Sequence, residues 1–298
     1  MAGCFACPRQ CGADRAGGAR GFCGVPEAPV VARAAPHFGE EPCISGQRGS
    51  GAVFFAGCTL RCVYCQNYAL SRAKQGEEIT VSRMREIFLE LRDQGVHNIN
   101  LVTASHYVRP VVEALDGLDL GIPVVWNSSG YESVESLKLL EGLVQVYLPD
   151  LKYLDGALAG RYSAAPDYPQ VAQAAIREMV RQRGAFVMDG DGMLRSGVLI
   201  RHLILPRQGQ NTKRVIDWVS DSFRPDEVLF SLMSQYTPMG DLKTFPELRQ
   251  PVSPALDRAL YHYLINSPIE NGYYQERDAS GVAMIPKFDG TGVKHKEE

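Results

Sequence analysis

The chain has 298 residues, of which 45% are hydrophobic and 22% are charged. These values are typical of a globular protein of enzyme size, and the length suits one large α/β domain or two average ones. The 31 basic residues nearly balance the 34 acidic ones, and the formal charge of −3 argues against a protein that binds nucleic acid through a basic surface.

Neither a membrane span nor a secretory signal is expected. The longest apolar stretches, such as residues 51–60, are shorter than the roughly 20 residues that cross a bilayer. The N-terminus Met-Ala-Gly-Cys lacks the basic and apolar regions of a signal peptide, so we expect a cytoplasmic protein.

The predicted elements divide the chain into three parts. Residues 1–50 are predicted to form a loop-rich, cysteine-rich segment, because Gly and Pro are frequent and no helical or strand period lasts. Residues 51–267 alternate strand and helix patterns, and residues 268–298 are expected to form an irregular tail packed on this core. In chain order the core pattern predicts strand 52–56, helix 82–94, strand 98–103, helix 107–117, strand 123–127, helix 133–140, strand 144–150, helix 168–183, a hairpin turn at 189–192, strand 198–205, helix 212–222, strand 228–233 and helix 254–266.

Six strand–helix repeats imply a parallel sheet with right-handed crossovers. The count favours an α/β fold in the form of a partial (β/α)6 barrel over a closed eightfold one. Active sites of such sheets lie at the carboxyl ends of the strands. These ends carry short polar clusters, at residues 103–106, 127–130, 150–152 and 234–236.

Eight cysteines lie within the first 65 residues, and the other positions contain none. A secreted protein would spread disulfides through its fold, whereas close spacings in a chain without an export signal indicate metal binding. Four thiolates, Cys4, Cys7, Cys11 and Cys23, would suffice for a closed zinc site or a fully ligated auxiliary iron–sulfur cluster, and both alternatives stay open. Cys43 fits no such spacing and is expected to be a buried or free thiol.

Cys58, Cys62 and Cys65 form a second cluster on the loop after the first core strand. Three thiolates at this spacing can hold three corners of a 4Fe–4S cubane and leave the fourth iron open for a substrate. The alternatives are a structural zinc with a fourth ligand from elsewhere, or buried thiols. Buried thiols rarely fall at this spacing, and structural zinc is usually closed by paired ligands.

The segment Gly57-Cys58-Thr59-Leu60-Arg61-Cys62-Val63-Tyr64-Cys65-Gln66-Asn67 resembles the signature loop of radical S-adenosylmethionine (radical SAM) enzymes. Tyr64 before the third cysteine and Asn67 after it most resemble the pyruvate formate-lyase activating enzymes. Over nearly the whole chain, the sequence is similar to a less characterised branch of this group that carries the extra N-terminal cysteines. The motifs that carry this similarity lie at residues 7–11, 39–42, 98–103, 147–152 and 201–206. The match to activating enzymes proper covers only the barrel motifs.

The resemblance implies a chemistry for the core. The amino and carboxylate groups of SAM would chelate the open iron, and a flavodoxin- or ferredoxin-type donor would supply an electron. Cleavage of the sulfonium bond would give methionine and a 5′-deoxyadenosyl radical, which abstracts hydrogen from a protein or peptide substrate. Catalysis is expected to depend on Cys58, Cys62, Cys65 and Lys152.

The resemblance also implies SAM contacts at the strand ends. Tyr64 would pack near the adenine, with Asn67 beside it. Ser105 and His106 stand where activating enzymes carry a Gly-Gly-Glu-Pro motif that contacts the SAM amino group, which is a departure from the family pattern.

Further contacts are implied on the later strands. Asn127 stands in place of an Asp that is linked to a monovalent cation, and Ser129 belongs to a strand-three Asn-Gly step. Asp150 and Lys152 match an Asp-x-Lys motif that meets SAM, although such a pair is often only an exposed ion pair worth at most about 1 kcal/mol. Arg201 matches a strand-five Arg that would hold the SAM carboxylate through two parallel hydrogen bonds. Tyr236, or its neighbour Gln235, stands at the position of a strand-six His that contacts SAM in the family. His202, next to Arg201, is expected to be structural.

Three functions are compatible with these patterns. The first is a radical SAM enzyme that acts on a protein or peptide, in its sharpest form an activase for a glycyl radical enzyme. The second is radical SAM modification of a peptide, an RNA or a small metabolite, of which the near-neutral charge disfavours RNA. The third is a non-enzyme, either an iron–sulfur electron carrier or a zinc-stapled binding module.

Overall fold

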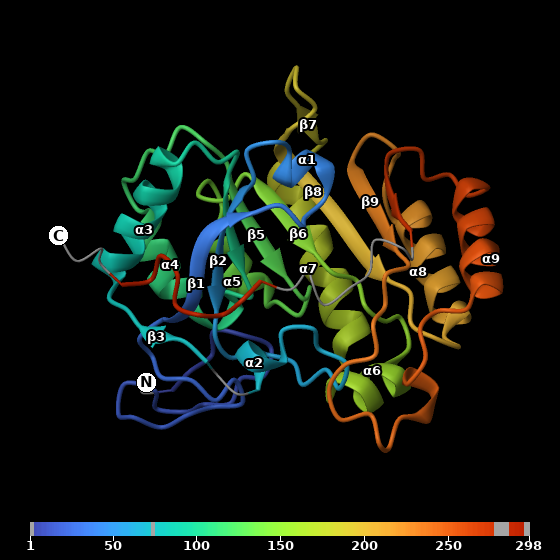
Figure 1. Ribbon diagram of the computed structural model, residues 1–298, viewed down its shortest axis with the longest axis horizontal. Coiled ribbons are helices and arrows are strands. Elements are labelled where there is room, and N and C mark those ends of the chain that lie inside the picture. The colour runs from blue at the N-terminus through green and yellow to red at the C-terminus, as the bar shows by residue number, and fades with distance from the viewer. Residues whose placement is uncertain (1–2, 73–74, 277–285, 295–298) are drawn as a thin grey trace.

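The computed structural model describes residues 3–72, 75–276 and 286–294. Six parallel strands form the centre of the fold, as the alternating pattern predicts (Figure 1). They pair in the order in which they occur along the chain, so each crossover leads to the neighbouring strand. These strands are β2 (Ser50–Phe55), β4 (Ile99–Val102), β5 (Val124–Ser128), β6 (Val146–Pro149), β8 (Leu194–Leu203) and β9 (Val228–Met233).

The crossover helices pack against the sheet through apolar faces, and capping residues fix where several of them begin. Thr80 accepts a hydrogen bond from the Arg83 backbone N–H and starts the first of them, which buries Met84, Phe88 and Leu91. Ser253 caps the last one, which has Pro254 in its first turn. These helices are α3 (Val81–Asp93), α4 (Val108–Leu115), α5 (Val134–Lys138), α7 (Tyr168–Arg183), α8 (Gly209–Ser222) and α9 (Pro254–Ile265).

The prediction of a loop-rich segment over residues 1–50 is wrong for its second half. Residues Val30–His37 form β1, which pairs antiparallel with β2 and carries the two-residue strand β3 (Glu77–Glu78) on its other edge. The strand begins with two valines but then contains three alanines and a proline, and it is mostly buried on both faces, so it does not show the alternation that marks a half-buried strand. A short helix, α1 (Pro42–Ser45), follows it.

The remaining differences are also short elements. The expected irregular tail contains β10 (Gly272–Gln275), which pairs parallel with β9. Helices α2 (Tyr68–Ser71) and α6 (Gly156–Ser163) were not predicted, and the two glycines of α6 give it a weak helical propensity. The turn at 189–192 is confirmed: it joins β7 (Val187–Met188) to β8.

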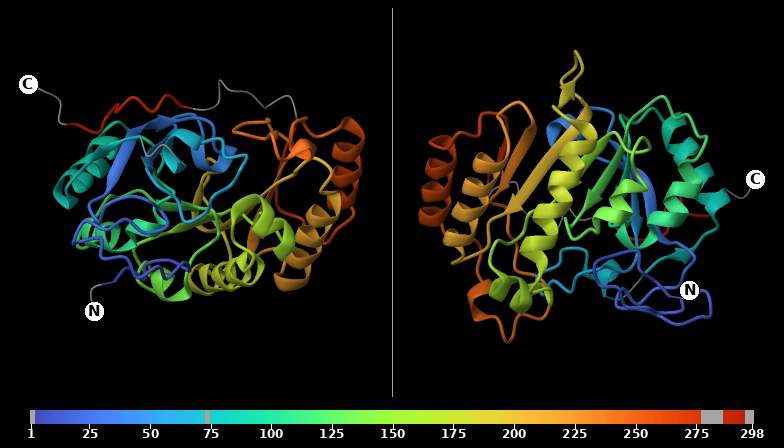
Figure 2. Two further views of the ribbon diagram at one scale, coloured as in Figure 1. Left: turned by 90° about the horizontal axis from the view of Figure 1, so that it is seen from below. Right: turned by 180° about the vertical axis from the view of Figure 1, so that it is seen from behind.

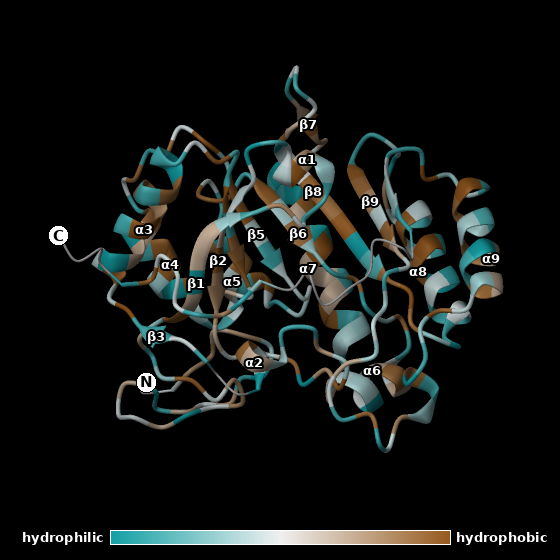
Figure 3. Ribbon diagram, in the orientation of Figure 1, coloured by the Kyte–Doolittle hydropathy of each residue, from teal (hydrophilic) through white to brown (hydrophobic). Residues whose placement is uncertain are grey.

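The sheet runs in the order β10-β9-β8-β6-β5-β4-β2-β1-β3, and within the described residues its two ends do not pair with each other. The architecture is therefore the predicted partial barrel. Figure 2 shows the curved sheet, and Figure 3 shows apolar residues concentrated on its central strands. Among the residues that the structure describes, no helix is both long and apolar enough to cross a membrane.

Residues 286–294, here called the C-terminal strap, cross the sheet on the side opposite to α5 and α7 (Figure 2). The strap pairs with β1 through the Ala34 N–H, which donates to Thr291 O at 2.8 Å. The buried Arg83 side chain holds its end by donating to the backbone carbonyls of Gly292, Val293 and Lys294. The strap therefore fastens the chain end to the first strands of the sheet.

His202 predicts a pH dependence of stability. It is 1% exposed, and its ring contacts Leu151 O at 2.6 Å and the Thr212 hydroxyl of α8 at 3.0 Å, which is the buried position expected of a structural residue. Burial lowers the pKa of His202 to about 4. The ordinary pKa of a histidine is about 6.5, so between pH 6.5 and pH 4 His202 binds a proton in the unfolded chain but not in the folded chain. The free energy of unfolding therefore falls as the pH drops from about 6.5 towards 4.

This residue alone is expected to account for about 2 kcal/mol of lost unfolding free energy between pH 7 and pH 5. Urea unfolding of the wild type and of His202→Gln at both pH values measures it. The variant should lose less stability on acidification than the wild type. Equal losses in the two proteins would contradict the assignment.

Candidate active site

A cavity of about 270 Å³ opens at the carboxyl ends of the parallel strands. It collects residues from the cysteine loop, from the ends of the six core strands and from the segment before α1. Most of the side chains singled out in the sequence line it: Cys58, Cys62, Tyr64, Cys65, Asn67, Asn127, Ser129, Asp150, Lys152, Arg201 and Tyr236. The strand ends and the cysteine loop thus form one site, as the fold class predicts.

The three thiols of the loop face this cavity together. Gly57, with φ of +82°, turns the chain out of the end of β2 and into the loop. Each sulfur accepts a hydrogen bond from the protein. Cys58 accepts from the Leu60 N–H at 3.4 Å, Cys62 from the Ser163 hydroxyl at 3.1 Å and Cys65 from the Ser71 hydroxyl at 3.3 Å.

Burial raises the pKa of Cys58 to about 12, and the neighbouring thiols Cys62 and Cys65 raise it further. Thiolates in such a place need a compensating cation, which a bound metal supplies. Three soft sulfur donors around one cavity fit a cluster that binds each thiolate through a different iron. Among the described residues, no group of three or more Cys, His, Asp or Glu is placed to hold a single metal ion.

Arg201 is the centre of a buried charged network beside the thiols. Its Nε lies 3.0 Å from Asp150 Oδ1, its Nη1 lies 2.8 Å from Glu40 Oε2 and its Nη2 lies 2.6 Å from Asn127 Oδ1. All three nitrogens therefore already have partners. A substrate carboxylate that took the expected two-pronged grip of Arg201 would have to replace two of these acceptors.

Lys152 completes the network. Its Nζ lies 2.5 Å from Asp150 Oδ2, and only 19% of the side chain is exposed, so the pair is not the exposed ion pair considered from sequence. Burial raises the pKa of Asp150, but the charges of Lys152 and Arg201 outweigh it and the net shift is downward. Burial lowers the pKa of Lys152, but the negative charges of Asp150 and Cys62 outweigh it and raise the pKa. The ammonium group therefore stays charged next to the cysteine loop.

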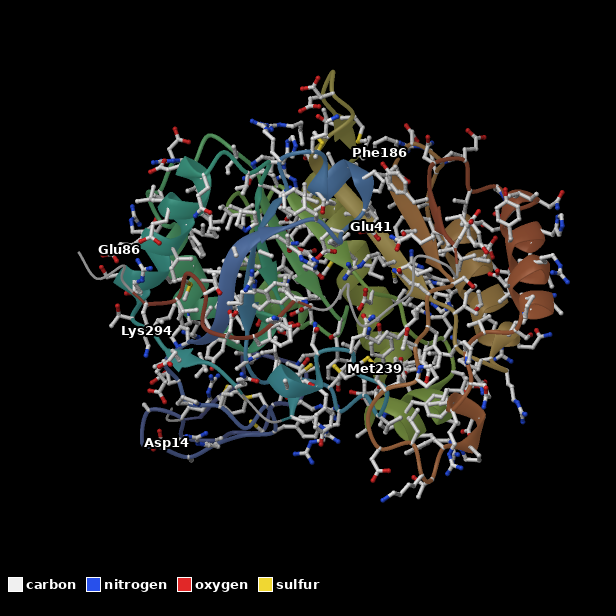
Figure 4. All side chains as sticks on the ribbon, in the orientation of Figure 1. Asp14, Glu41, Glu86, Phe186, Met239 and Lys294 are labelled. Carbon is white, nitrogen blue, oxygen red and sulfur yellow. The ribbon has the colours of Figure 1, made fainter. Side chains whose placement is uncertain are left out.

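Glu40 and Glu41 are site residues that were not selected from sequence. Glu40 accepts from Asn100 at 3.2 Å and from Asn127 at 2.9 Å as well as from Arg201. Glu41 is 1% exposed and lies beside α1 (Figure 4). Burial and the nearby charge of Glu40 raise the pKa of Glu41 despite the opposing charge of Arg201. The available signal was two adjacent acids before Pro42, which begins α1.

Ser105 and His106 do not line the cavity, contrary to the expected contact with SAM. Thr103 lines it instead and has a φ of +63°, which is unusual for a β-branched residue. The chain then enters a 3-10 turn (Ser105–Tyr107) that buries both side chains. The Ser105 hydroxyl bonds to Glu132 at 2.5 Å, and His106 Nε2 lies 2.8 Å from Ala56 O.

The aromatic residues of the site offer ring surfaces to the cavity. Tyr64 and Tyr236 lie edge to face with centroids 6.0 Å apart. The Tyr236 hydroxyl donates to Leu248 O at 2.7 Å, so it is already used outside the cavity. Asn67 stands at the start of α2, and the Ser129 carbonyl accepts from the Tyr168 hydroxyl at 2.8 Å.

The N-terminal cysteines do not come together as a set of four. Burial raises the pKa of Cys7 to about 12, and the nearby thiols of Cys4 and Cys23 add to this rise. Cys11 is exposed and lies against Gly21. As placed, the four thiols do not fit a closed tetrahedral metal site. Cys43 is 1% exposed, which confirms the expected buried thiol.

The N-terminal segment nevertheless packs directly on the cysteine loop. Arg9 donates to Thr59 O at 2.8 Å and to Ala164 O at 2.7 Å. A side chain at Gly57 would meet Val25 and the carbonyl of Cys23, so the two cysteine segments are in contact. The segment therefore forms part of the support for the loop.

Gly130 predicts a packing effect at the site. It has a φ of +73°, and a Cβ there would lie 2.4 Å from Asp150 O. Gly142 has a similar φ of +84° but has no atom within 4 Å of its Cβ position. Gly142→Ala should cost only the left-handed backbone penalty of about 1–2 kcal/mol, while Gly130→Ala should cost about 1–3 kcal/mol more through the clash. Urea unfolding of both variants measures the difference, and equal losses would contradict the close approach.

Comparisons with known proteins agree with this geometry. Residues 52–156 match the sequence model of the radical SAM superfamily. The curated protein "Uncharacterized protein MJ0674" of Methanocaldococcus jannaschii is 29% identical over 257 residues, which cover 83% of this chain and 70% of that protein.

Two solved structures are similar to the chain. Streptococcus suis SuiB superposes with a TM-score of 0.51 at 13% identity, and the match covers 74% of this chain but only 47% of SuiB. The chain thus spans about half the length of SuiB and shares its fold over that part. A domain of pyruvate-formate lyase-activating enzyme from Bacteroides vulgatus gives a TM-score of 0.38 at 12% identity, covering 66% of this chain and 91% of that domain.

Proposed function

Because residues 52–156 match the sequence model of the radical SAM superfamily, we propose that the chain is a radical SAM enzyme, which cleaves SAM reductively and uses the resulting radical to take hydrogen from a protein or peptide. The observation that carries the proposal is the convergence of Cys58, Cys62 and Cys65 with the strand-end residues on one cavity. When bound by these thiolates, a 4Fe–4S cluster supplies an open iron for SAM and the electron that breaks its sulfonium bond.

The charged network suits a ligand that carries both signs. SAM has an ammonium group, a carboxylate and a sulfonium, and the cavity offers Lys152 and Arg201 as cations and Asp150 and Glu40 as acids. Asp150 stays ionised because Lys152 and Arg201 hold its pKa down against burial. Arg201 can exchange two of its present partners for the SAM carboxylate, and Lys152 can donate to SAM from beside Cys62.

The aromatic side chains of the cavity suit the adenine of SAM. The rings of Tyr64 and Tyr236 give an apolar surface on which the adenine can lie, with the Asn67 amide within the same cavity. Asn127 and Ser129 also line the cavity. A radical needs a site that shields it from water and from side reactions, and the buried network beside the thiols contributes to this.

The sharpest form of the proposal is an activase that makes a glycyl radical in a partner enzyme, with a flavodoxin- or ferredoxin-type donor in the cytoplasm. The resemblance of the cysteine loop to activating enzymes supports it. Radical modification of another peptide or of a small metabolite is the alternative, and an electron carrier without SAM chemistry is the outcome if no cleavage occurs.

The identity of the substrate is tested by electron paramagnetic resonance after the reduced, reconstituted protein has been incubated with SAM and candidate glycyl radical enzymes. A glycyl signal supports the activase. Cleavage of SAM without any glycyl signal removes the activase alone. A mass shift on a peptide in the same mixtures would then favour the peptide alternative.

We also propose that Cys4, Cys7, Cys11 and Cys23 take up zinc or an auxiliary iron–sulfur cluster. Support comes from the close spacing of these four cysteines in the sequence and from the need of a loop-rich segment for a metal that orders it. Anaerobic iron, sulfide and zinc analysis decides: about four irons with one zinc indicate zinc, and about eight irons indicate a second cubane.

A further inference from the structure

The thiol of Cys62 ends a chain of buried hydroxyl groups that no part of the sequence pattern indicates. Ser163, the last residue of α6, lies with its Oγ 3.1 Å from Cys62 Sγ. The Tyr153 hydroxyl lies 2.8 Å from that Oγ, and the Tyr64 hydroxyl lies 2.6 Å from the Tyr153 hydroxyl. Ser163 and Tyr153 are fully buried, and Tyr64 is nearly so.

Resting on the proposed function, we infer that Ser163 is a positioning residue that sets the reduction potential of the cluster through its hydrogen bond to Cys62. A cluster-bound thiolate has no proton, so Ser163 must donate to it. Because a hydroxyl has only one proton, Ser163 must in turn accept from Tyr153, and Tyr153 must accept from Tyr64. All three protons therefore point along the chain towards the sulfur.

The backbone holds Ser163 in register with the cysteine. The Arg61 N–H donates to Ser163 O at 3.1 Å, and the Val63 N–H donates to Tyr162 O at 2.9 Å. These two bonds clamp the residues on either side of Cys62 to the end of α6. Asp155 caps the start of the same helix by accepting from the N–H groups of Ala157 and Leu158. Helix α6 therefore fixes the Ser163 hydroxyl against Cys62, which lies 101 residues earlier in the sequence.

Cys62 differs in this respect from the other two ligands. Cys65 accepts from Ser71, which is only six residues away, and Cys58 accepts from a backbone N–H of its own loop. Among the described residues, no relay of hydroxyl groups lies behind either donor. Hydrogen bonds in a chain strengthen one another, so Ser163 is expected to be the strongest of the three donors.

A hydrogen bond to a cluster sulfur stabilises the more negative, reduced cluster and raises its reduction potential. Removing the hydroxyl should therefore make the cluster harder to reduce. The Ser163→Ala variant should shift the reduction equilibrium about tenfold towards the oxidised cluster, which is about 59 mV for one electron. Tyr153→Phe keeps Ser163 but breaks the relay, and it should shift the equilibrium in the same direction by less.

The test is a redox titration of the reconstituted full chain without SAM, followed by electron paramagnetic resonance, after iron has been counted in each protein. Ser163→Thr keeps the hydroxyl and should restore the wild-type potential. Ser220→Ala, whose hydroxyl bonds only to Ile216 O within α8, serves as the matched control with no shift.

A wild-type potential in a fully loaded Ser163→Ala protein would overturn the inference while leaving the proposed function intact. If Ser163→Ala does not load iron, an unchanged potential in Tyr153→Phe would overturn it instead. A wild-type chain that binds no cubane contradicts the proposed function, and the inference falls with it.

Discussion

Replacing Cys62 with alanine is expected to abolish assembly of the cubane and, with it, all SAM cleavage. Only three thiols line the cavity, and a cubane with an open iron needs all of them. The loop itself should keep its place, because its neighbouring N–H groups remain bonded to α6. The loss should therefore appear as missing iron at the core site and an absent reduced-cluster signal, with the circular dichroism of the fold retained.

Cys43→Ala is the matched control for this variant. Like Cys62, Cys43 is a cysteine without a disulfide, but it is buried in α1 among apolar neighbours and does not line the cavity. Its substitution should leave the iron content and the SAM cleavage at wild-type values. A Cys62→Ala protein that keeps its cluster and still cleaves SAM would refute the assignment of the three ligands.

Replacing Arg201 with methionine is expected to cause the largest loss of stability among single changes in the cavity. Arg201 holds Glu40, Asn127 and Asp150 with three different nitrogens. Among the described residues, Glu40 then has no ion-pair partner left and Asp150 retains only Lys152. Removal of one partner from a buried charge pair costs about 3–5 kcal/mol, because the other charge is left buried without compensation.

Arg214→Met provides the comparison. Arg214 pairs with Asp155 at 3.4 Å but is 59% exposed, so its loss should cost at most about 1 kcal/mol. Urea unfolding of both variants at pH 7.5 gives the two free energies. SAM binding to the Arg201→Met protein should also be lost, since the expected carboxylate partner is gone. A loss of stability no greater than that of Arg214→Met would show that the network is not energetically coupled.

Much of the core could be predicted from sequence because parallel strands are buried on both faces. Val228–Met233 is almost wholly apolar, and its predicted bounds agree with β9. Helix α7 was also placed at its observed ends, Tyr168 and Arg183, by the spacing of its apolar residues. In contrast, β1 is defined by its pairing with β2 rather than by any local pattern.

The site shows the same division between local and distant causes. The cysteine loop is local in sequence, so its three ligands could be selected at once. Ser105 and His106 follow a predicted strand and stand where activating enzymes carry a SAM-binding motif, so they are expected at the cavity, but a turn after Thr103 buries them. Glu40 reaches the network from the connection between β1 and α1, two elements that the sequence did not predict, and Ser163 reaches Cys62 from another helix that the sequence did not predict.

The central claim is that this loop and cavity bind a 4Fe–4S cluster and cleave SAM. Its most direct test is to measure 5′-deoxyadenosine by mass spectrometry after the anaerobically reconstituted, reduced chain is incubated with SAM. We expect 5′-deoxyadenosine to accumulate only with both reductant and cluster present. A chain that is fully loaded with iron and reduced, yet forms no 5′-deoxyadenosine, would contradict the claim.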